Sequence, residues 1–206
     1  VETLCSKLTL KIRKKMPEID DERAEVINYG LQLAIGEVPK TFILLIIAYL
    51  CGVLKLSIIA LLAIMPYRAT SGGVHLKTHI GCIIGTSLFY VGSSLLSKYI
   101  VLEPVYIKYA LIGITWIFSM IMINLYAPAD TEAVPILRKK ERSIKKKLSY
   151  ITMTLTLVVS IIIKNTLFSN LLIFLTIFQT IWISKFTYKI TNNKYGYEEY
   201  LKTQNI

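Results

Sequence analysis

Long apolar segments separated by clusters of lysine and arginine are the feature that most limits what this chain can fold into. Hydrophobic residues make up 54% of the sequence and the mean hydropathy is +0.55, yet 18% of the residues are charged. Charged side chains are costly inside lipid, so they must gather in the loops between the apolar segments. The pattern therefore predicts an all-α integral membrane protein that forms one domain over residues 1–206.

Six apolar segments predict three membrane hairpins at 41–66, 80–126 and 150–184. The segments pair as 41–54 with 56–66, 80–97 with 105–126, and 150–163 with 167–184. The first two would span only about 21 Å and 16 Å as helices, less than the roughly 30 Å hydrocarbon core. We expect both to be short, tilted or sheltered by the others, with Lys55 at the far tip of their hairpin. A four-span arrangement, in which 41–66 does not cross, stays open.

The distribution of basic residues predicts which loops face the cytoplasm. Seven Lys or Arg lie in the N-terminal arm (1–40), seven in the 127–149 loop and four in the 185–206 tail. The three turns at the other ends of the segments hold almost none. Cytoplasmic loops of membrane proteins carry such an excess of positive charge. All three basic regions, and the 67–79 loop with them, are therefore predicted on the cytoplasmic side.

The N-terminal arm is predicted to hold two helices. Residues 1–16 place apolar residues at near-helical spacing among lysines, which is typical of a basic helix lying on an anionic lipid bilayer. Packing of this helix on the protein itself is equally compatible with the pattern. Pro17 interrupts it, Asp20 is expected to begin a second helix, and Pro39 is expected to end it.

Other classes of protein fit the composition less well. The net charge of +11 could suggest nucleic-acid binding, but the apolar segments argue against it. Three dispersed cysteines, Cys5, Cys51 and Cys82, indicate no disulfide framework. No CxxC or HExxH arrangement accompanies the histidines, so we expect neither a metal site nor a cofactor.

The polar interval from Arg68 to Cys82 carries the chemistry that stands out. It holds both histidines, one of the three cysteines and the Gly72-Gly73 pair between two apolar segments. A neutral thiol is a poor nucleophile, and a nearby imidazole can remove its proton. The interval therefore suggests a cysteine nucleophile. A cysteine that begins an apolar segment is, however, more often a small buried hydrophobe.

Spacing alone leaves the base open. On a continuous helix His75 and Cys82 would lie two turns, or about 10 Å, apart, which is too far for proton transfer. A dyad of these two requires the backbone to bend, and Gly72, Gly73 and Gly81 would permit this. His79 lies three residues before Cys82, a spacing that meets readily on a helix. Helical geometry thus slightly favours His79.

Two blocks of this sequence resemble the AgrB family of membrane cysteine endopeptidases. The first is Ser71-Gly72-Gly73-Val74-His75, followed after six residues by Cys82. The second is Tyr126-Ala127-Pro128-Ala129-Asp130-Thr131-Glu132, followed by Pro135-Ile136 and a lysine-rich run. By the matching positions the resemblance implies that Cys82 is the nucleophile and His75 its base. It also implies that the backbone of 72–81 is not a straight helix.

The resemblance implies a function in quorum sensing. A member of the family would cleave an AgrD-type precursor peptide at the cytoplasmic face of the bacterial cell membrane and promote its cyclisation. A substrate cysteine would give a thiolactone and a serine a lactone, and the chain does not decide between them. Homo-oligomerisation is left open.

The same interval holds the candidates for binding the substrate. Arg68 and Lys77 could bind an acidic substrate tail, or could only mark the cytoplasmic border. Ser71, Gly72 and Gly73 are candidates for contacts to the substrate or to its oxyanion, where backbone N–H groups could donate.

Three carboxylates are weaker candidates. Asp130 and Glu132 could supply a third catalytic group or a substrate contact, although a helix-capping role after Pro128 is the preferred interpretation. Glu37 could orient the imidazole, but an exposed surface position is preferred. The rival functions are a small transporter or channel subunit, which would need ionisable residues inside several spans, and a non-enzymatic membrane adaptor.

Overall fold

A computed structural model describes residues 2–16, 18–76, 78–100, 102–132 and 135–204. These residues form α-helices and one isolated parallel bridge, and no strand occurs among them. The all-α prediction is confirmed. The helices are α1 (Glu2–Lys15), α2 (Asp21–Leu50), α3 (Leu54–Ser71), α4 (His79–Tyr99), α5 (Val105–Tyr126), α6 (Lys139–Ile162), α7 (Thr166–Trp182), α8 (Lys185–Ile190) and α9 (Gly196–Gln204).

The chain divides into two compact units, 1–47 and 48–206. The first unit contains α1 and most of α2. The Asp20 carboxylate accepts the N–H of Arg23 at 2.8 Å, so the predicted start of the second helix is confirmed. Arg13 near the end of α1 forms an ion pair with Asp21 at the start of α2.

Two helix ends predicted from the sequence were wrong. Pro39 does not end a helix, because α2 continues through it to Leu50. A proline inside a helix removes one backbone hydrogen bond. The apolar residues after Pro39 stay helical despite that loss. The segment predicted at 56–66 is the longer helix α3, which passes Pro66 and ends at Ser71. The 67–79 loop therefore shortens to 72–78.

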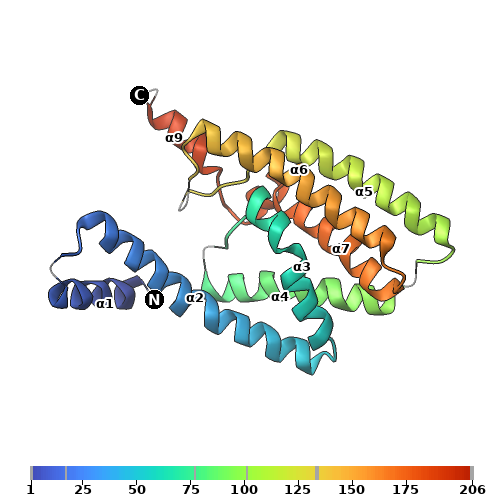
Figure 1. The fold of residues 1–206 in the computed structure, drawn as a ribbon, viewed down its shortest axis with the longest axis horizontal. Coiled ribbons are helices and arrows are strands. Elements are labelled where there is room, and N and C mark those ends of the chain that lie inside the picture. Colours follow the sequence, from blue (N-terminus) through green and yellow to red (C-terminus); the bar gives the residue numbers. More distant parts are fainter. Residues whose placement is uncertain (1, 17, 77, 101, 133–134, 205–206) are drawn as a thin grey trace. The chain divides into compact units, whose positions relative to one another are not determined.

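Helix α7 lies at the centre of the second unit. It packs against α3, α4, α5 and α6, and α5, α6 and α7 run side by side (Figure 1). Helix α4 packs against α3 and α7, whereas α5 packs against α6 and α7. The predicted pairing of 80–97 with 105–126 as a packed hairpin is therefore not confirmed, although α6 and α7 do pack together.

Small polar side chains join these helices inside the unit. Ser57 on α3 donates to Ser94 on α4 at 3.2 Å. The Thr180 hydroxyl on α7 lies 3.1 Å from the Tyr67 hydroxyl and 2.7 Å from that of Ser119. Small residues let helix backbones approach closely, and their hydroxyls hydrogen-bond between helices in lipid.

Among the described residues, three helices are long and apolar enough to cross a membrane. They are α3 over Leu54–Ser71, α4 over Ile80–Tyr99 and α5 over Val105–Tyr126. At about 1.5 Å per residue these lengths are about 27, 30 and 33 Å. Helix α7 is apolar but one residue shorter than α3, and α6 begins with a lysine-rich half. The second unit is thus that of a membrane protein.

The loops of the second unit gather at two ends. One end, here called the basic end, brings together 72–78, the segment after α5, the lysine-rich start of α6 and the tail. There the Lys146 ammonium donates to the carbonyl of Asn124, in the last turn of α5, at 2.6 Å. At the opposite end the Lys98 ammonium donates to Gly52 O at 3.4 Å. Basic side chains thus concentrate beside the 72–78 loop.

Cys51 offers a test of how often the chain crosses the membrane. It is exposed in the turn between α2 and α3, at the end opposite the basic end. In a variant with Cys5→Ala and Cys82→Ala, we expect Cys51 to react with an impermeant thiol reagent applied to intact cells. In a cysteine-free background, Lys164→Cys should also react, whereas Lys140→Cys should not. Protection of Cys51 beside a reactive Lys164→Cys would support four spans.

Candidate functional site

The loop from Gly72 to Thr78 interrupts the helical path between α3 and α4. Gly72 has φ +74° and Gly73 has φ +143°, a region of backbone conformation that favours glycine. The prediction that 72–81 is not one straight helix is confirmed. Gly81 plays a different part from the one expected, since it lies in the first turn of α4. A Cβ there would come within 2.7 Å of the Thr78 hydroxyl.

This loop is fastened to the segment that follows α5. The N–H of Gly73 donates to Ala129 O at 2.9 Å, and the N–H of Ala129 donates to Ser71 O at 2.8 Å. A Cβ on Gly72 would lie 2.3 Å from Ala129 O, which leaves room for glycine alone. The two sequence blocks that carry the family resemblance therefore meet in space.

Gln179 on α7 holds the loop from the other side. Its side chain is fully buried, and its amide nitrogen donates to Ser71 Oγ at 2.9 Å and to Gly72 O at 2.8 Å. The amide oxygen accepts from Arg68 at 3.3 Å. One buried amide thus uses both donors and its acceptor to join the end of α3 to the loop.

Trp182, one turn further along α7, completes this support. Its indole N–H donates to Val74 O at 3.0 Å. The indole also closes over the loop, because a Cβ on Gly73 would lie 2.9 Å from Trp182 Cδ1. The Arg68 guanidinium lies 5.4 Å from the centre of the Phe89 ring and 5.9 Å from that of Trp182. Cation–π attraction at these distances ties Arg68 into the structure.

Sequence reasoning missed both Gln179 and Trp182. Gln179 stands out within the apolar stretch 167–184, where a polar amide needs buried partners. That signal could have identified it as a bundle-facing residue. Its partners, more than 100 positions earlier in the chain, could not be read from a local pattern.

Cys82 lies on α4 directly after the loop. Thr78 caps the helix by accepting the N–H of Gly81 at 3.0 Å, and Thr78 O accepts the N–H of Cys82 at 2.9 Å. The thiol is reduced and half-buried, with Sγ 3.9 Å from the Thr86 hydroxyl. The positive end of a helix dipole, which lies here, favours negative charge nearby.

The two histidines fall on either side of a boundary. His75 is exposed in the non-helical loop, whereas His79 is the first residue of α4. The backbone from His79 to Cys82 is therefore helical, as a pairing of these two would require. Lys77 and the side chain of His79 lie outside what the structure describes.

The N–H groups of the glycine pair are already used within the fold. That of Gly72 donates to Arg68 O at 3.0 Å, and that of Gly73 donates to Ala129 O. Ser71 Oγ donates to Tyr67 O at 2.7 Å as well as accepting from Gln179. In this conformation these three residues maintain the loop, and they do not point donors at a substrate oxyanion.

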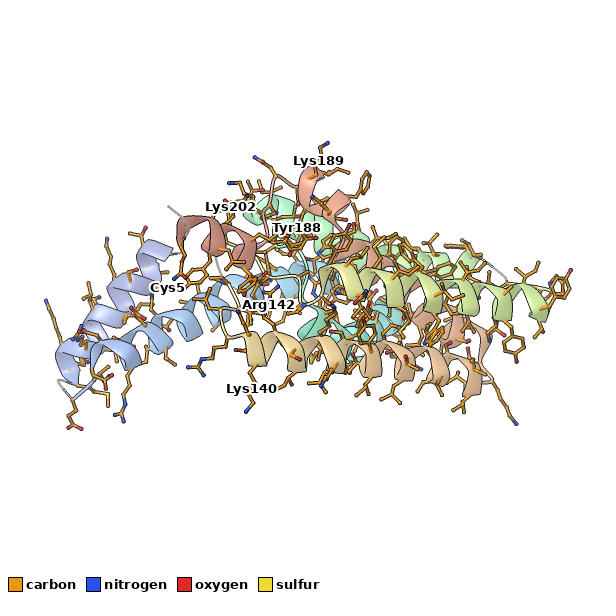
Figure 2. The ribbon with its side chains drawn as sticks, turned by 90° about the horizontal axis from the view of Figure 1, so that it is seen from above. Cys5, Lys140, Arg142, Tyr188, Lys189 and Lys202 are labelled. Atoms are coloured by element: carbon orange, nitrogen blue, oxygen red, sulfur yellow. The ribbon has the colours of Figure 1, made fainter. Side chains whose placement is uncertain are left out.

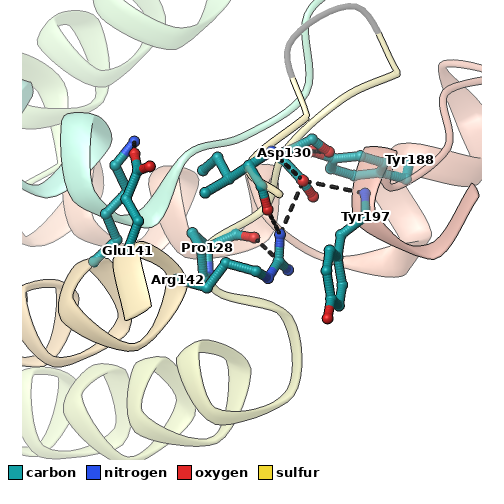
Figure 3. Close-up of polar contacts among 8 residues, drawn as sticks. Pro128, Asp130, Glu141, Arg142, Tyr188 and Tyr197 are labelled. Carbon is teal, nitrogen blue, oxygen red and sulfur yellow. Dashed lines mark hydrogen bonds and ion pairs between the residues drawn. The ribbon is translucent and has the colours of Figure 1, made fainter. Parts of the chain in front are cut away.

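Asp130 joins three parts of the basic end (Figure 3). Its buried carboxylate accepts from the N–H of Ile136 at 2.9 Å, from Arg142 at 2.9 Å and from the N–H of Tyr197 at 3.1 Å. The helix-capping interpretation after Pro128 was wrong, because α6 begins at Lys139 with Arg138 as its N-cap. Asp130 instead connects the segment after α5 to α6 and to α9.

Tyrosines extend the Asp130 cluster into the tail. The Tyr188 hydroxyl donates to the backbone carbonyl of Asp130 at 3.0 Å. Burial raises the pKa of Tyr188 above its ordinary value, and the Asp130 carboxylate adds to this, so the hydroxyl keeps its proton. Tyr188 also stacks on Tyr195 at a centroid distance of 4.0 Å.

The other two candidate carboxylates, those of Glu132 and Glu37, are exposed, and each pairs with a lysine. Glu132 lies 3.5 Å from the Lys194 ammonium. Glu37 belongs to the first unit, where it pairs with Lys40 at 2.6 Å. Among the described residues, no group of three or more His, Cys, Asp or Glu side chains could hold a metal ion.

The sequence of this chain is similar to those of known proteins. A family model described as Accessory gene regulator B matches residues 5–183. An AgrB-like protein of Clostridium acetobutylicum is 28% identical over 98% of this chain and 95% of its own. An AgrB-like protein of Listeria monocytogenes is 26% identical over 88% of this chain and 87% of its own. No solved structure matches the chain.

The family match covers both sequence blocks, the whole 72–78 loop and the helices that hold it. It extends through Gln179 and Trp182 on α7, the two residues that fix the loop from within the helices. This chain therefore belongs to the AgrB family, the accessory gene regulator B proteins of quorum sensing.

Proposed function

We propose that this protein is a membrane cysteine endopeptidase that cleaves an AgrD-type precursor peptide and helps to cyclise it. Cys82 is the nucleophile and His75 is its base. The observation that carries the proposal is the loop between α3 and α4, which Gln179, Trp182 and Ala129 hold in a non-helical path. On such a path the imidazole and the thiol are not constrained to the two-turn separation of a continuous helix.

The first half of the reaction transfers the substrate acyl group to the enzyme. His75 takes the proton of the Cys82 thiol as the sulfur attacks a peptide carbonyl. Collapse of the tetrahedral intermediate breaks the C–N bond, and His75 gives its proton to the leaving amine. A thioester on Cys82 and a free C-terminal fragment result. The N–H groups of Gly72 and Gly73 are engaged within the fold, and those of Gly81 and Cys82 bond to Thr78, so other donors at the site would stabilise the oxyanion.

The second half decides between hydrolysis and cyclisation. A thiol or hydroxyl of the bound substrate attacks the thioester carbonyl and gives its proton to His75. The new C–S or C–O bond closes the ring, the C–S bond to Cys82 breaks, and the proton passes from His75 to the Cys82 thiolate. A well-oriented intramolecular nucleophile can have an effective molarity of about 10⁵ M or more, well above the concentration of water. Cyclisation is therefore favoured when the substrate keeps its nucleophile near the site. The product is a thiolactone from cysteine or a lactone from serine.

The basic end gives the site its surroundings. Lysines of α6 and of the tail lie at this end of the second unit, and Arg68 is fixed beside Gln179. Such a concentration of positive charge is typical of the cytoplasmic face and favours acidic peptide segments. We propose that the site faces the cytoplasm and that the precursor approaches from there.

Cysteine substitutions test the identity of the nucleophile. We expect Cys82→Ala to lower precursor cleavage by at least about 10³-fold, because the attacking sulfur is lost. Cys51→Ala is the matched control, since that thiol is exposed at the opposite end, and Cys5→Ala should also stay active. Mass spectrometry of co-expressed precursor provides the measurement. Equal loss in all three correctly inserted variants would contradict the assignment.

Histidine substitutions test the identity of the base. His75→Ala should reduce cleavage by about 10²–10⁴-fold, the range typical of a lost general base. His79→Ala should retain most of the activity, because the family resemblance assigns the base to His75. Cleavage rates in membranes containing equal amounts of each variant would decide. The opposite ranking would assign the base to His79 through the helical spacing to Cys82.

A further inference from the structure

A pocket at the basic end, formed by α8, α9 and the turn between them, is separate from the Cys82 site. Its volume is about 480 Å³. Four lysines and two glutamates contribute to its lining, so cationic groups outnumber carboxylates by two. These residues are Lys185, Lys189, Lys194, Lys202, Glu198 and Glu199. Lys189 on α8 and Lys202 on α9 are labelled in Figure 2.

Two of the four lysines form ion pairs with one carboxylate of the pocket wall. Lys194 lies 3.3 Å and Lys202 lies 2.6 Å from the Glu199 carboxylate. Within the described part of the chain, Lys185 and Lys189 form no ion pair. They lie one helical turn apart on α8 and are both exposed. These two ammonium groups give the pocket its capacity for an anion.

Exposed apolar side chains lie beside these two lysines. Phe186 is 69% exposed and Ile190 is 67% exposed, also one turn apart on α8. Opposite them, buried Tyr188 fastens the helix to Asp130, and Ser184 caps its start. A short helix held in place with bare aromatic and aliphatic groups outward is suited to a lipid surface. Lysine stems beside such groups can lie along lipid while their ammonium groups reach polar headgroups.

The position of α8 in the chain places it at the membrane border. Helix α7, the apolar helix at the centre of the second unit, ends at Trp182, and α8 begins at Lys185. The lysine-rich start of α6 lies at the same end, which is the side where anionic headgroups attract basic segments. Charge, apolar surface and position thus agree on one kind of ligand.

We propose that this pocket binds the phosphate of an anionic phospholipid, with Lys185 and Lys189 as the cationic contacts and Phe186 and Ile190 among the acyl chains. Bound lipid would connect the tail to the membrane surface. Because Tyr188 joins α8 to Asp130, the lipid would also support the segment that holds Gly73. This inference does not depend on the proposed peptidase activity.

Lipid binding to the purified full-length protein tests the proposal. In neutral detergent, native mass spectrometry should show phosphatidylglycerol bound to the unaltered protein in preference to phosphatidylcholine. The double variant Lys185→Gln/Lys189→Gln should bind phosphatidylglycerol about 30-fold more weakly, given the usual contribution of two basic residues near a lipid surface. The double variant Lys139→Gln/Lys140→Gln removes the same charge from exposed positions on α6 and should bind nearly as well as the unaltered protein.

Further arms separate the lipid from other anions. Phe186→Ser/Ile190→Ser should weaken phosphatidylglycerol binding, and inorganic phosphate at equal concentration should not displace the lipid. All six substituted side chains are exposed, so the melting temperature without lipid serves as a check of folding and should stay unchanged. Equal losses in the α6 control would overturn the proposal. Displacement of phosphatidylglycerol by inorganic phosphate would also overturn it. So would binding of a poly-glutamate peptide through Lys185 and Lys189 that is tighter than the binding of phosphatidylglycerol.

Discussion

The side-chain amide of Gln179 is the interaction on which the site depends. It lies fully buried on the central helix and bonds to Arg68, Ser71 and Gly72, the residues where α3 ends and the 72–78 loop begins. Leaving one buried polar group without its partner costs about 1–3 kcal/mol, so the amide and the loop conformation stabilise each other. Helix α7 also packs against α3, α4, α5 and α6. The hydrogen bonds of Gln179 therefore attach the loop to the central helix of the second unit. The proposed base thus sits on a non-helical segment that is nevertheless firmly held.

The Asp130 cluster supports the same loop from outside the helices. The fully buried Asp130 carboxylate forms an ion pair at 2.9 Å with the partly exposed Arg142, and leaving a buried charge without its partner typically costs about 3–5 kcal/mol. The neighbouring residue, Ala129, exchanges backbone hydrogen bonds with Ser71 and Gly73. Both sequence blocks therefore belong to one structural unit, in which the Asp130 carboxylate fixes the segment that pairs with the 72–78 loop. Its hydrogen bonds explain the buried position of Asp130 as a structural role, without direct participation in the reaction.

Local patterns predicted the helices well and their long-range partners poorly. Apolar runs identified the membrane helices, and the Gly72-Gly73 pair correctly marked a break in the helical path. Pro39 misled because a long apolar helix tolerates the loss of one hydrogen bond. Nothing near Asp130 in sequence reveals that Tyr197 donates to it from the tail. Likewise, the glycine N–H groups looked available to an oxyanion until the structure placed Arg68 O and Ala129 O against them.

We propose that Cys82 carries the substrate as a thioester before the ring of the product closes. Intact-mass analysis of the purified protein tests this most directly, using a precursor whose nucleophilic cysteine or serine is replaced by alanine. The account predicts that cyclic product is lost while an adduct of the precursor's acyl fragment accumulates on Cys82, or hydrolyses slowly, and that Cys82→Ala forms no adduct. Undiminished cyclic product from the alanine precursor, or an adduct carried by Cys51, would contradict it.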